Sequence, residues 1–428
     1  MELLNRKKTG KVERPVKVLQ FGEGNFLRAF VDYMIDIANE QGKFNGDIVL
    51  VKPIEFGSLD RFHDQECQYT VQLRGIVDGE PKRINRIVTS VADAVDAYGE
   101  YQKYADYAKL DSLRYIVSNT TEAGIVYDDT DRLEMEPPKS YPGKLTKFLY
   151  ERYKHFNGAM DKGLVMLPVE LIDDNGIHLK ECVEKLAVLW NLEDGFKTWL
   201  DEACVFTSTL VDRIVTGYPR DEAEELCKEF GYQDNLIVTG EPFALWVIES
   251  AKDISKEFPL PDAGLPVIFT DNQKPYKQRK VRILNGAHTS FVLASYLCGN
   301  DIVLESMQDE LIFNFMKATI FDEVIPTLTL PKQDLIDFAE AVITRFNNPY
   351  VKHALLSISL NSVSKWRARC MPSFLEYIKN EGKLPTHLTF SLAALMAFYT
   401  GTEIRDKALI GHRDGTEYQI LDDAAVLE

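Results

Sequence analysis

The first 270 residues alternate short, continuous apolar runs with segments that have apolar residues at helical spacing. The apolar runs are residues 16–21, 47–54, 113–119, 164–169 and 267–270, and residues 25–39 have the spacing of a helix. Strands that are apolar on both faces, separated by helices, are typical of a parallel sheet covered by helices on both sides. The sequence therefore predicts an α/β domain with a doubly wound sheet. We expect Val267–Thr270 to be the last strand of that series.

The second part of the chain has a different pattern. Helical spacing recurs over residues 279–298, 301–318, 332–347, 350–360, 371–381 and 388–400. Leu330-Pro331 and Leu384-Pro385 separate these segments, because proline ends a helix. We expect residues 1–275 to form the α/β domain and residues 276–428 an all-helical one. The last residues, ILDDAAVLE, leave little helix after Asp422, which is compatible with a truncated form of a longer protein.

Charge and composition limit the classes of partner. Lys and Arg total 49 against 66 Asp and Glu, so the net charge is −17, and such a field repels nucleic-acid backbones. An anionic substrate therefore needs a local basic pocket. The N-terminus lacks a signal peptide, the longest apolar stretch (390–401) is too short for a membrane span, and the six cysteines are scattered. We expect a cytoplasmic protein that binds a small molecule and exists as a monomer or homodimer.

A glycine turn follows the first predicted strand. Gly22 and Gly24 lie between that strand and a predicted helix, where backbone amides at a helix start can bind the phosphates of a dinucleotide. Leu27 stands where the usual fingerprint has a third glycine, so an ordinary turn stays an alternative. The second strand ends at Lys52-Pro53 instead of an acidic residue, which leaves the choice between NAD and NADP open.

Three polar residues are grouped in the stretch KVRILNGAHTSF. On an α-helix Lys280, Asn285 and His288 lie at about 0°, 140° and 80° around the axis, so one side can present an amine, an amide and an imidazole. A lysine can exchange the proton of a hydroxyl, and an amide can stabilise an oxyanion. Gly286 is unfavourable inside a helix, which predicts a close approach there. A surface lysine with a core histidine is the alternative.

Other candidates are the polar residues at strand ends and one basic cluster. Asn175-Gly176 follows an apolar strand, as Asp212-Arg213 follows another, and ligands of α/β proteins bind at that edge of the sheet. A plain turn and a plain ion pair are the respective alternatives. Lys365, Arg367 and Arg369 are unusual in so acidic a chain and suit an anion, although a solvated helix face explains them equally well. The histidines show no metal-ligand spacing, which favours a metal-independent mechanism.

With these motifs in order, the whole chain resembles the polyol-specific long-chain dehydrogenases, the mannitol dehydrogenase family. The spacing Lys280-x4-Asn285-x2-His288 matches the catalytic signature of that family, and Asp212-Arg213 matches its VDRI motif. The resemblance implies a Rossmann-type NAD-binding domain followed by a mostly α-helical one. It implies Lys280 as general acid/base, Asn285 and Asn175 as oxyanion hole, and His288, Asp212, Arg213, Lys365 and Arg369 as substrate-side residues. The nicotinamide-binding turn then comprises Phe21, Gly22, Gly24, Asn25 and Phe26.

Details of the sequence point to a sugar-acid branch of that family. GEGNFLRAF, SNTTEAGI at 118–125 and EPFALWVIES at 241–250 are similar to the branch that interconverts D-tagaturonate and D-altronate with NAD(H) in hexuronate breakdown. The resemblance implies that substrate, with its carboxylate at the 365–369 cluster. Glu170 or Leu171 replaces an Asn of the mannitol branch, so the oxyanion-hole partner of Asn285 stays open. Fructuronate, mannitol, a sugar phosphate and a non-catalytic dinucleotide-sensing role are the alternatives.

Overall fold

The structure is a computed structural model that describes residues 1–121, 123–401 and 403–427. It divides into two compact units. The first unit is Met1–Arg74 with Arg83–Gln273, and the second is Gly75–Lys82 with Lys274–Glu428. Glu122 of the SNTTEAGI segment and Glu428 at the chain end lie outside the described residues. Within the described residues, no helix has the length and apolar character needed to cross a membrane.

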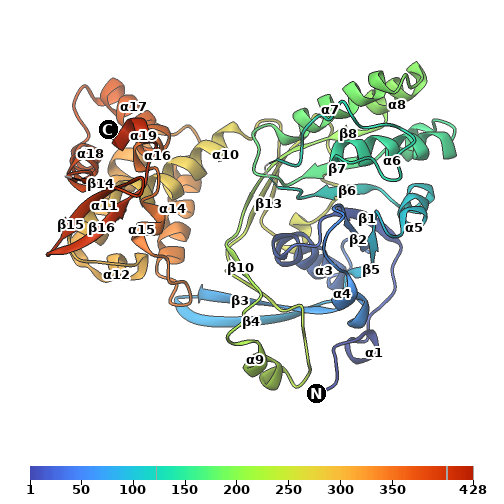
Figure 1. Ribbon diagram of the computed structural model, residues 1–428, viewed down its shortest axis with the longest axis horizontal. Helices are drawn as coiled ribbons and strands as arrows, with labels where there is room; N and C mark the ends of the chain where they lie inside the picture. Colours follow the sequence, from blue (N-terminus) through green and yellow to red (C-terminus); the bar gives the residue numbers. More distant parts are fainter. Residues whose placement is uncertain (122, 402, 428) are drawn as a thin grey trace. The chain divides into compact units, whose positions relative to one another are not determined.

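The first unit is built on the parallel sheet that the sequence predicts. Its six strands run in the order β5-β2-β1-β6-β7-β8, and every neighbouring pair is parallel (Figure 1). The strands are β1 Val16–Phe21, β2 Asp47–Lys52, β5 Val91–Asp96, β6 Tyr115–Ser118, β7 Val165–Pro168 and β8 Val205–Phe206. This order is that of the doubly wound dinucleotide-binding fold, which confirms the predicted fold class.

Each face of this sheet has its own apolar core. Val18 of β1 packs into one cluster with α3 (Tyr33–Glu40), whereas Leu19 and Phe21 pack into another. That second cluster includes residues of α6 (Tyr141–His155), α7 (Asn175–Leu189) and α8 (Asp194–Glu202). Because successive side chains of a strand point to opposite faces, a strand covered on both sides must be apolar throughout. The continuous apolar runs of the sequence have this origin.

Two smaller sheets hold the other strands of the first part of the chain. β13 (Val267–Thr270) pairs with β12 (Leu245–Glu249) in a separate sheet of order β13-β12-β9, so the expectation that it ends the parallel series is wrong. β9 (Ser208–Asp212) belongs to the same separate sheet. β3 (Tyr69–Val77) and β4 (Glu80–Val88) form a hairpin whose turn is Asp78-Gly79, a residue pair typical of such turns, with φ of 54° and 79°. It shares a sheet of order β10-β11-β3-β4 with β10 (Val215–Gly217) and β11 (Val238–Gly240).

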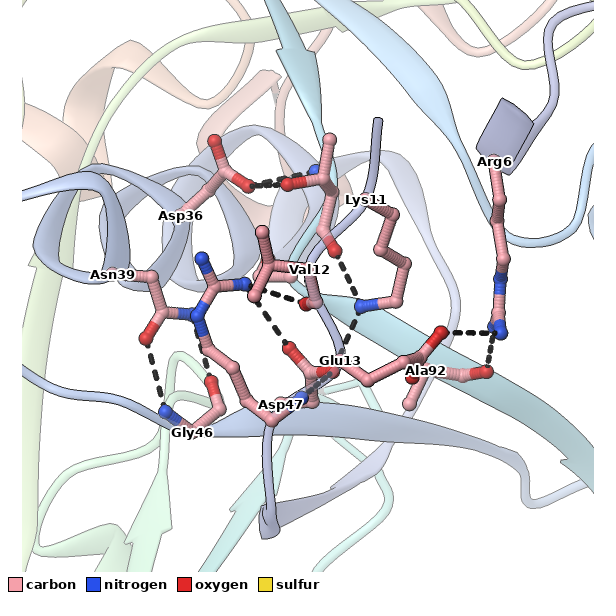
Figure 2. A network of polar contacts seen from close by, with 12 residues as sticks. Arg6, Lys11, Val12, Glu13, Asp36, Asn39, Gly46, Asp47 and Ala92 are labelled. Carbon is pink, nitrogen blue, oxygen red and sulfur yellow. Dashed lines mark hydrogen bonds and ion pairs between the residues drawn. The ribbon is translucent and has the colours of Figure 1, made fainter. Parts of the chain in front are cut away.

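The N-terminal segment is attached to the start of β2 by buried polar contacts (Figure 2). The ammonium of Lys11 lies 2.8 Å from the Asp47 carboxylate and donates to the carbonyl of Thr89, and both charged side chains are fully buried. Asn39 exchanges two hydrogen bonds with the backbone of Gly46. Buried charges are tolerated only when they are paired and hydrogen-bonded, and here both conditions hold.

The second unit is mostly helical, as the sequence predicts, with two differences. The long helices are α11 (Gly286–Leu297), α13 (Glu310–Ala318), α14 (Lys332–Phe346), α17 (Met371–Glu381) and α18 (Thr386–Phe398). Within the helix expected at 350–360, only the short α15 (Leu355–Ile358) forms. A second helix, α16 (Ser362–Arg369), forms where none was expected. Residues 403–420 form an antiparallel sheet of β14 (Glu403–Arg405), β15 (Ala408–Arg413) and β16 (Thr416–Ile420), so the second half of the chain is not wholly helical.

The remaining helices are short or serve as connections. They are α1 (Arg6–Thr9), α2 (Asn25–Leu27), α4 (Asp60–Asp64), α5 (Tyr101–Asp106), α9 (Ala223–Phe230), α10 (Lys274–Arg279), α12 (Val303–Gln308) and α19 (Ala424–Leu427). Within the described part of the chain, π-helical segments interrupt longer helices at η1 (Arg28–Asp32), η5 (Lys280–Asn285) and η6 (Thr319–Val324). Short π segments of this kind are frequent at functional sites.

Candidate active site

The turn after β1 needs glycine at its first position. Gly22 has φ 122°, which L side chains rarely adopt, and a Cβ there would lie 3.2 Å from the carbonyl oxygen of Asn119. The same Cβ would lie 3.1 Å from Cδ1 of Leu27, a fully buried side chain. Leu27, which stands in place of the usual third glycine, therefore packs directly beside Gly22 and fills the space at the turn.

Neither the backbone conformation of Gly24 nor the atoms around it require a glycine at this position. It precedes α2 with φ −69°, and a Cβ at this position would meet no atom within 4 Å. Gly24 instead borders a cavity of about 410 Å³ at the carboxyl ends of β1, β2 and β6. The lining residues are Gly22, Glu23, Gly24, Pro53, Ile54, Asn119, Thr120, Thr121, Ala123, Gly124, Val126, Asp128, Lys139, Ser140 and Tyr141. This open space lets a ligand approach the backbone closely, as a bound pyrophosphate requires.

The other residues predicted for the cofactor turn hold it in place. Phe21 is buried, and its ring centroid lies 5.0 Å from that of Tyr141. Phe26 stacks on Phe30, and the Asn25 side chain accepts a hydrogen bond from Arg28. Arg28 also donates to the carbonyls of Glu23 and Leu236, so one buried guanidinium fixes the whole turn. Arg28 is not among the residues predicted for the cofactor turn, although it follows Leu27 directly in the same sequence stretch.

Lys52, the last residue of β2, is already bound by groups of the protein itself. The ammonium of Lys52 donates to the carbonyls of residues 54, 55 and 56 and lies 3.1 Å from the Asp96 carboxylate. Lys52 therefore stabilises the loop beside the cavity instead of offering a free positive charge to it. A 2′-phosphate needs such a charge, as given in other dinucleotide-binding folds by an arginine near this strand end. This arrangement favours NAD over NADP.

Asn175 is predicted for the oxyanion hole, but its side chain is fully engaged elsewhere. It is buried, and its Nδ2 donates to the carbonyls of Pro168, Glu170 and Thr209. Its Oδ1 accepts from the backbone of Thr209. Because an amide nitrogen has two hydrogens, these contacts leave none for a substrate oxygen. They favour a structural role for Asn175, which joins the end of β7 to β9.

Arg213 is likewise engaged by the protein's own backbone. Its guanidinium donates to the carbonyls of Ala29, Pro242 and Phe243 and stacks over the ring of Tyr33. Asp212, also buried, ends β9 in the separate small sheet and not in the parallel sheet. Because β9 lies outside the parallel sheet, its end does not place these two residues at the cavity. Their substrate-binding roles stay predictions.

The Lys280 segment is a π-helix and not the regular helix assumed from the sequence. Lys280–Asn285 form η5, and α11 follows without interruption. A π turn closes hydrogen bonds between residues five apart, so Asn285 follows Lys280 by about one turn along the axis. The angles of 0° and 140° expected for a regular helix are therefore wrong, and the π turn brings the two side chains closer to one face.

The close approach expected at Gly286 is present. A Cβ on Gly286 would lie 3.3 Å from the carbonyl oxygen of Arg369, at the end of α16, and the thiol of Cys370 points to the Gly286 carbonyl at 3.6 Å. Arg369 also donates to the hydroxyl of Thr289. Glycine therefore lets α16 pack against the start of α11, which brings the basic cluster next to the Lys280 helix.

His288 lies among aromatic rings and cationic side chains. It stacks on Phe346 with ring centroids 4.2 Å apart and meets His353 edge-on at 5.4 Å. Burial lowers the pKa of His288 well below its usual value, and the positive charges of His353, Arg345, Arg369 and Lys365 lower it further. The imidazole is therefore neutral near pH 7. Its Nε2 is buried and has no hydrogen-bond partner among the described residues.

In the second unit, Lys365 and Arg369 lie next to His288, which follows Lys280 and Asn285 along one continuous helical segment. Two further neighbours of His288, Arg345 and His353, were missed. Arg345 is the last residue but one of α14, and His353 lies in the loop before α15, about 60 residues from His288 in sequence. No motif links them to the signature, because only the packing of α14, α16 and the loop around α11 brings them near.

Two family models match the chain. The model of the mannitol dehydrogenase Rossmann domain matches residues 16–261, and that of the mannitol dehydrogenase C-terminal domain matches residues 272–424. Among solved structures, a substrate-free D-sorbitol dehydrogenase covers 98% of this chain and 88% of its own at 20% identity, with a TM-score of 0.81. Pseudomonas fluorescens mannitol 2-dehydrogenase, in a ternary complex with NAD and D-mannitol, covers 100% and 88% at 22% identity, with a TM-score of 0.69.

Curated relatives are more similar in sequence. Altronate oxidoreductase of Yersinia enterocolitica is 46% identical over 429 residues, which are 100% of this chain and 87% of the relative. That of Pectobacterium atrosepticum is 47% identical with the same coverage, and that of Bacteroides thetaiotaomicron is 44% identical over 97% of this chain and 87% of the relative. The glycine turn, the parallel sheet and the Lys280 helix agree with these matches, and the chain belongs to the mannitol dehydrogenase family.

Proposed function

We propose that this protein is an NAD-dependent oxidoreductase that interconverts D-tagaturonate and D-altronate. The observation that supports this substrate class best is the cationic group around His288 in a chain of net charge −17. A sugar acid differs from a polyol by a carboxylate, and Lys365 and Arg369 are suited to bind it. Full-length similarity to altronate oxidoreductases supports the same reading.

The cavity at Gly22 and Gly24 suits the cofactor. Its volume is in the range of small-molecule sites, and the open side of Gly24 fits the close approach of a pyrophosphate. When bound, NAD(H) supplies or accepts the hydride at the nicotinamide ring. The side chains of the protein then orient the substrate and move the proton.

In the second unit, each residue of the signature has a role in alcohol–ketone chemistry. The ammonium of Lys280 protonates the ketone oxygen as it becomes a hydroxyl, and the neutral amine removes that proton in the reverse direction. The amide of Asn285 donates a hydrogen bond to the same oxygen while negative charge develops on it. The buried Nε2 of neutral His288 binds a substrate hydroxyl, which gives this atom the partner it lacks within the described residues.

Cofactor and substrate are tested first by binding and turnover. Purified protein is titrated with NADH and NADPH by fluorescence, and NADH oxidation is then followed with tagaturonate, fructuronate, fructose and a keto-sugar phosphate. We expect NADH, but not NADPH, to bind tightly, and we expect turnover mainly with tagaturonate. Preference for fructuronate or fructose would change the substrate, and dinucleotide binding without any turnover would favour the sensing role.

The carboxylate site is tested by substitutions on one helix. Arg369→Met and Lys365→Met should raise KM for the uronate by about tenfold or more, because each removes one charged contact, and leave KM for a neutral keto-sugar unchanged. Arg367→Met is the matched control, since Arg367 is exposed on the same helix. Equal losses on charged and neutral substrates would contradict a role in carboxylate binding.

A further inference from the structure

Glu170 is a buried carboxylate next to the cofactor cavity that the proposed mechanism does not use. It lies two residues after the end of β7 and is 2% exposed. Burial raises the pKa of its carboxyl group, while hydrogen bonds from Thr120 and Ser118 oppose that shift. A buried carboxylate is costly unless it is hydrogen-bonded, so the partners of Glu170 indicate what it does.

Within the described residues, the side-chain hydrogen bonds of Glu170 go to the end of β6 and to the turn that follows it. Its Oε1 accepts from the backbone N–H of Thr120 and from the Thr120 hydroxyl, both at 2.9 Å. Its Oε2 accepts from the hydroxyl of Ser118 at 3.1 Å. The main chain of Glu170 is fixed in turn, because its carbonyl accepts from the amide of Asn175 at 3.0 Å. Glu170 therefore links a rigid strand end to the turn that follows β6.

That turn forms one wall of the cavity. Asn119 and Thr120 line the cavity, and Ser118 is the last residue of β6. The carbonyl oxygen of Asn119 lies 3.2 Å from the position that a Cβ on Gly22 would take. A small displacement of the turn therefore changes the space between the glycine turn and the wall.

The position of β6 in the sheet, relative to β1 and β2, indicates which half of the cofactor lies next to the turn after β6. In folds of this strand order, the end of the second strand contacts the adenosine ribose. Here that strand is β2, whereas β6 and β7 lie on the other side of β1. The turn held by Glu170 is thus on the half that takes the nicotinamide nucleotide. Tyr141 also lines the cavity, and the pKa of its phenol group is raised by burial and by the charge of Glu170.

We propose that Glu170 is a positioning residue that sets the nicotinamide half of the cofactor site through the Ser118–Thr120 turn. The inference rests on the proposed function only in taking the cavity as the NAD(H) site. It does not depend on which sugar acid is the substrate. Glu170 touches neither substrate nor cofactor in this account, so its effect must pass through Thr120.

The test compares two ligands that share the adenosine half. NADH and ADP-ribose are titrated against the wild-type protein and Glu170→Ala, and the melting temperature is measured for each. We expect the Kd for NADH to rise about tenfold or more and the Kd for ADP-ribose to change less than twofold. Glu170→Gln keeps an oxygen for Thr120 and should restore most of the NADH affinity. Unchanged NADH affinity in Glu170→Ala, or an equal loss for both ligands, would overturn the inference.

A matched buried carboxylate separates positioning from general stability. Asp47 is buried in the same unit at the start of β2 and accepts from Lys11 and from the backbone of Arg14, but it does not line the cavity. Asp47→Ala should lower the melting temperature and leave both Kd values unchanged. A double-mutant cycle with Thr120→Val should give non-additive NADH affinities, since the Thr120 hydroxyl is one of the three donors to Glu170. Additive effects would overturn the route through Thr120, and a wild-type protein that binds neither ligand would overturn the proposed function as well.

Discussion

The guanidinium of Arg213 donates a hydrogen bond to the carbonyl of Ala29, with Nη1 2.5 Å from the oxygen. Ala29 lies in the π segment η1 of the helix that follows the glycine turn, and Arg213 follows β9. Arg213 donates to this buried carbonyl from a distant part of the chain. Arg213 therefore ties the end of β9 to the helix of the cofactor turn.

Replacing Arg213 should reduce stability more than it changes substrate preference. Arg213→Met leaves three buried carbonyls without their charged donor, and we expect a loss of about 2–4 kcal/mol in the free energy of unfolding. Urea unfolding of the apoprotein measures it. A stable variant with a raised KM for uronates would instead support the substrate-binding role predicted from the sequence.

The two glycines of the turn should respond differently to alanine. Gly22→Ala introduces a Cβ at φ 122° close to Asn119 and Leu27, so both the melting temperature and NADH binding should fall. Gly24→Ala meets no protein atom, so its melting temperature should stay at the wild-type value while the Kd for NADH rises about tenfold. Scanning calorimetry without cofactor and fluorescence titration check both. Normal NADH affinity in Gly24→Ala would contradict close approach of the cofactor at this point.

Lys280 should be essential for turnover and dispensable for NADH binding. We expect Lys280→Ala to lower kcat by about 100- to 10,000-fold, the usual contribution of a general acid or base. Lys280→Arg should be equally impaired, because arginine keeps the positive charge but does not release its proton near neutral pH. Lys332→Ala, an exposed lysine on α14, is the control. Steady-state kinetics at saturating NADH decide the question, and near-normal turnover in Lys280→Ala would exclude the proposed role.

Asp32 should make the protein less stable as the pH rises from about 4 to about 7. Burial raises the pKa of its carboxyl group to about 7, from its ordinary value of 3.8. Between these values the folded state holds a proton that the unfolded state has lost, so each pH unit reduces stability by at most about 1.4 kcal/mol. The protonated form also suits the geometry: Oδ2 accepts from Tyr69, whereas Oδ1 and the neighbouring Gln20 Oε1 lack partners within the described part of the chain.

Asp32→Asn provides the measurement. The variant should flatten the pH dependence of the melting temperature over this range and be more stable than the wild type at pH 8, because it cannot ionise. Asp106→Asn, at an exposed carboxylate, serves as the control. Identical pH profiles for Asp32→Asn and the wild type would show that Asp32 does not titrate in this range.

Local signals in the sequence were sufficient for the sheet and for the family signature. The apolar runs of β1, β2, β6 and β7 predict parallel strands because their own residues must be buried on both faces. The pair Asp78-Gly79 predicts a hairpin because its turn needs positive φ. Gly286 similarly predicts a close approach, since no local reason favours glycine inside a helix.

The remaining features depend on contacts between segments that are distant in sequence. β13 joins β12 and β9 because of pairing partners that its own four residues do not encode. The π turn at Lys280–Asn285, the backbone contacts that engage Asn175 and Arg213, and the approach of His353 to His288 all arise from packing. The sequence alone thus determined which strands are buried and which residues match the signature of the family, because burial and residue chemistry are local properties. Only the tertiary structure decided which polar side chains are left for a ligand, because a donor is available only when no neighbouring carbonyl has taken it.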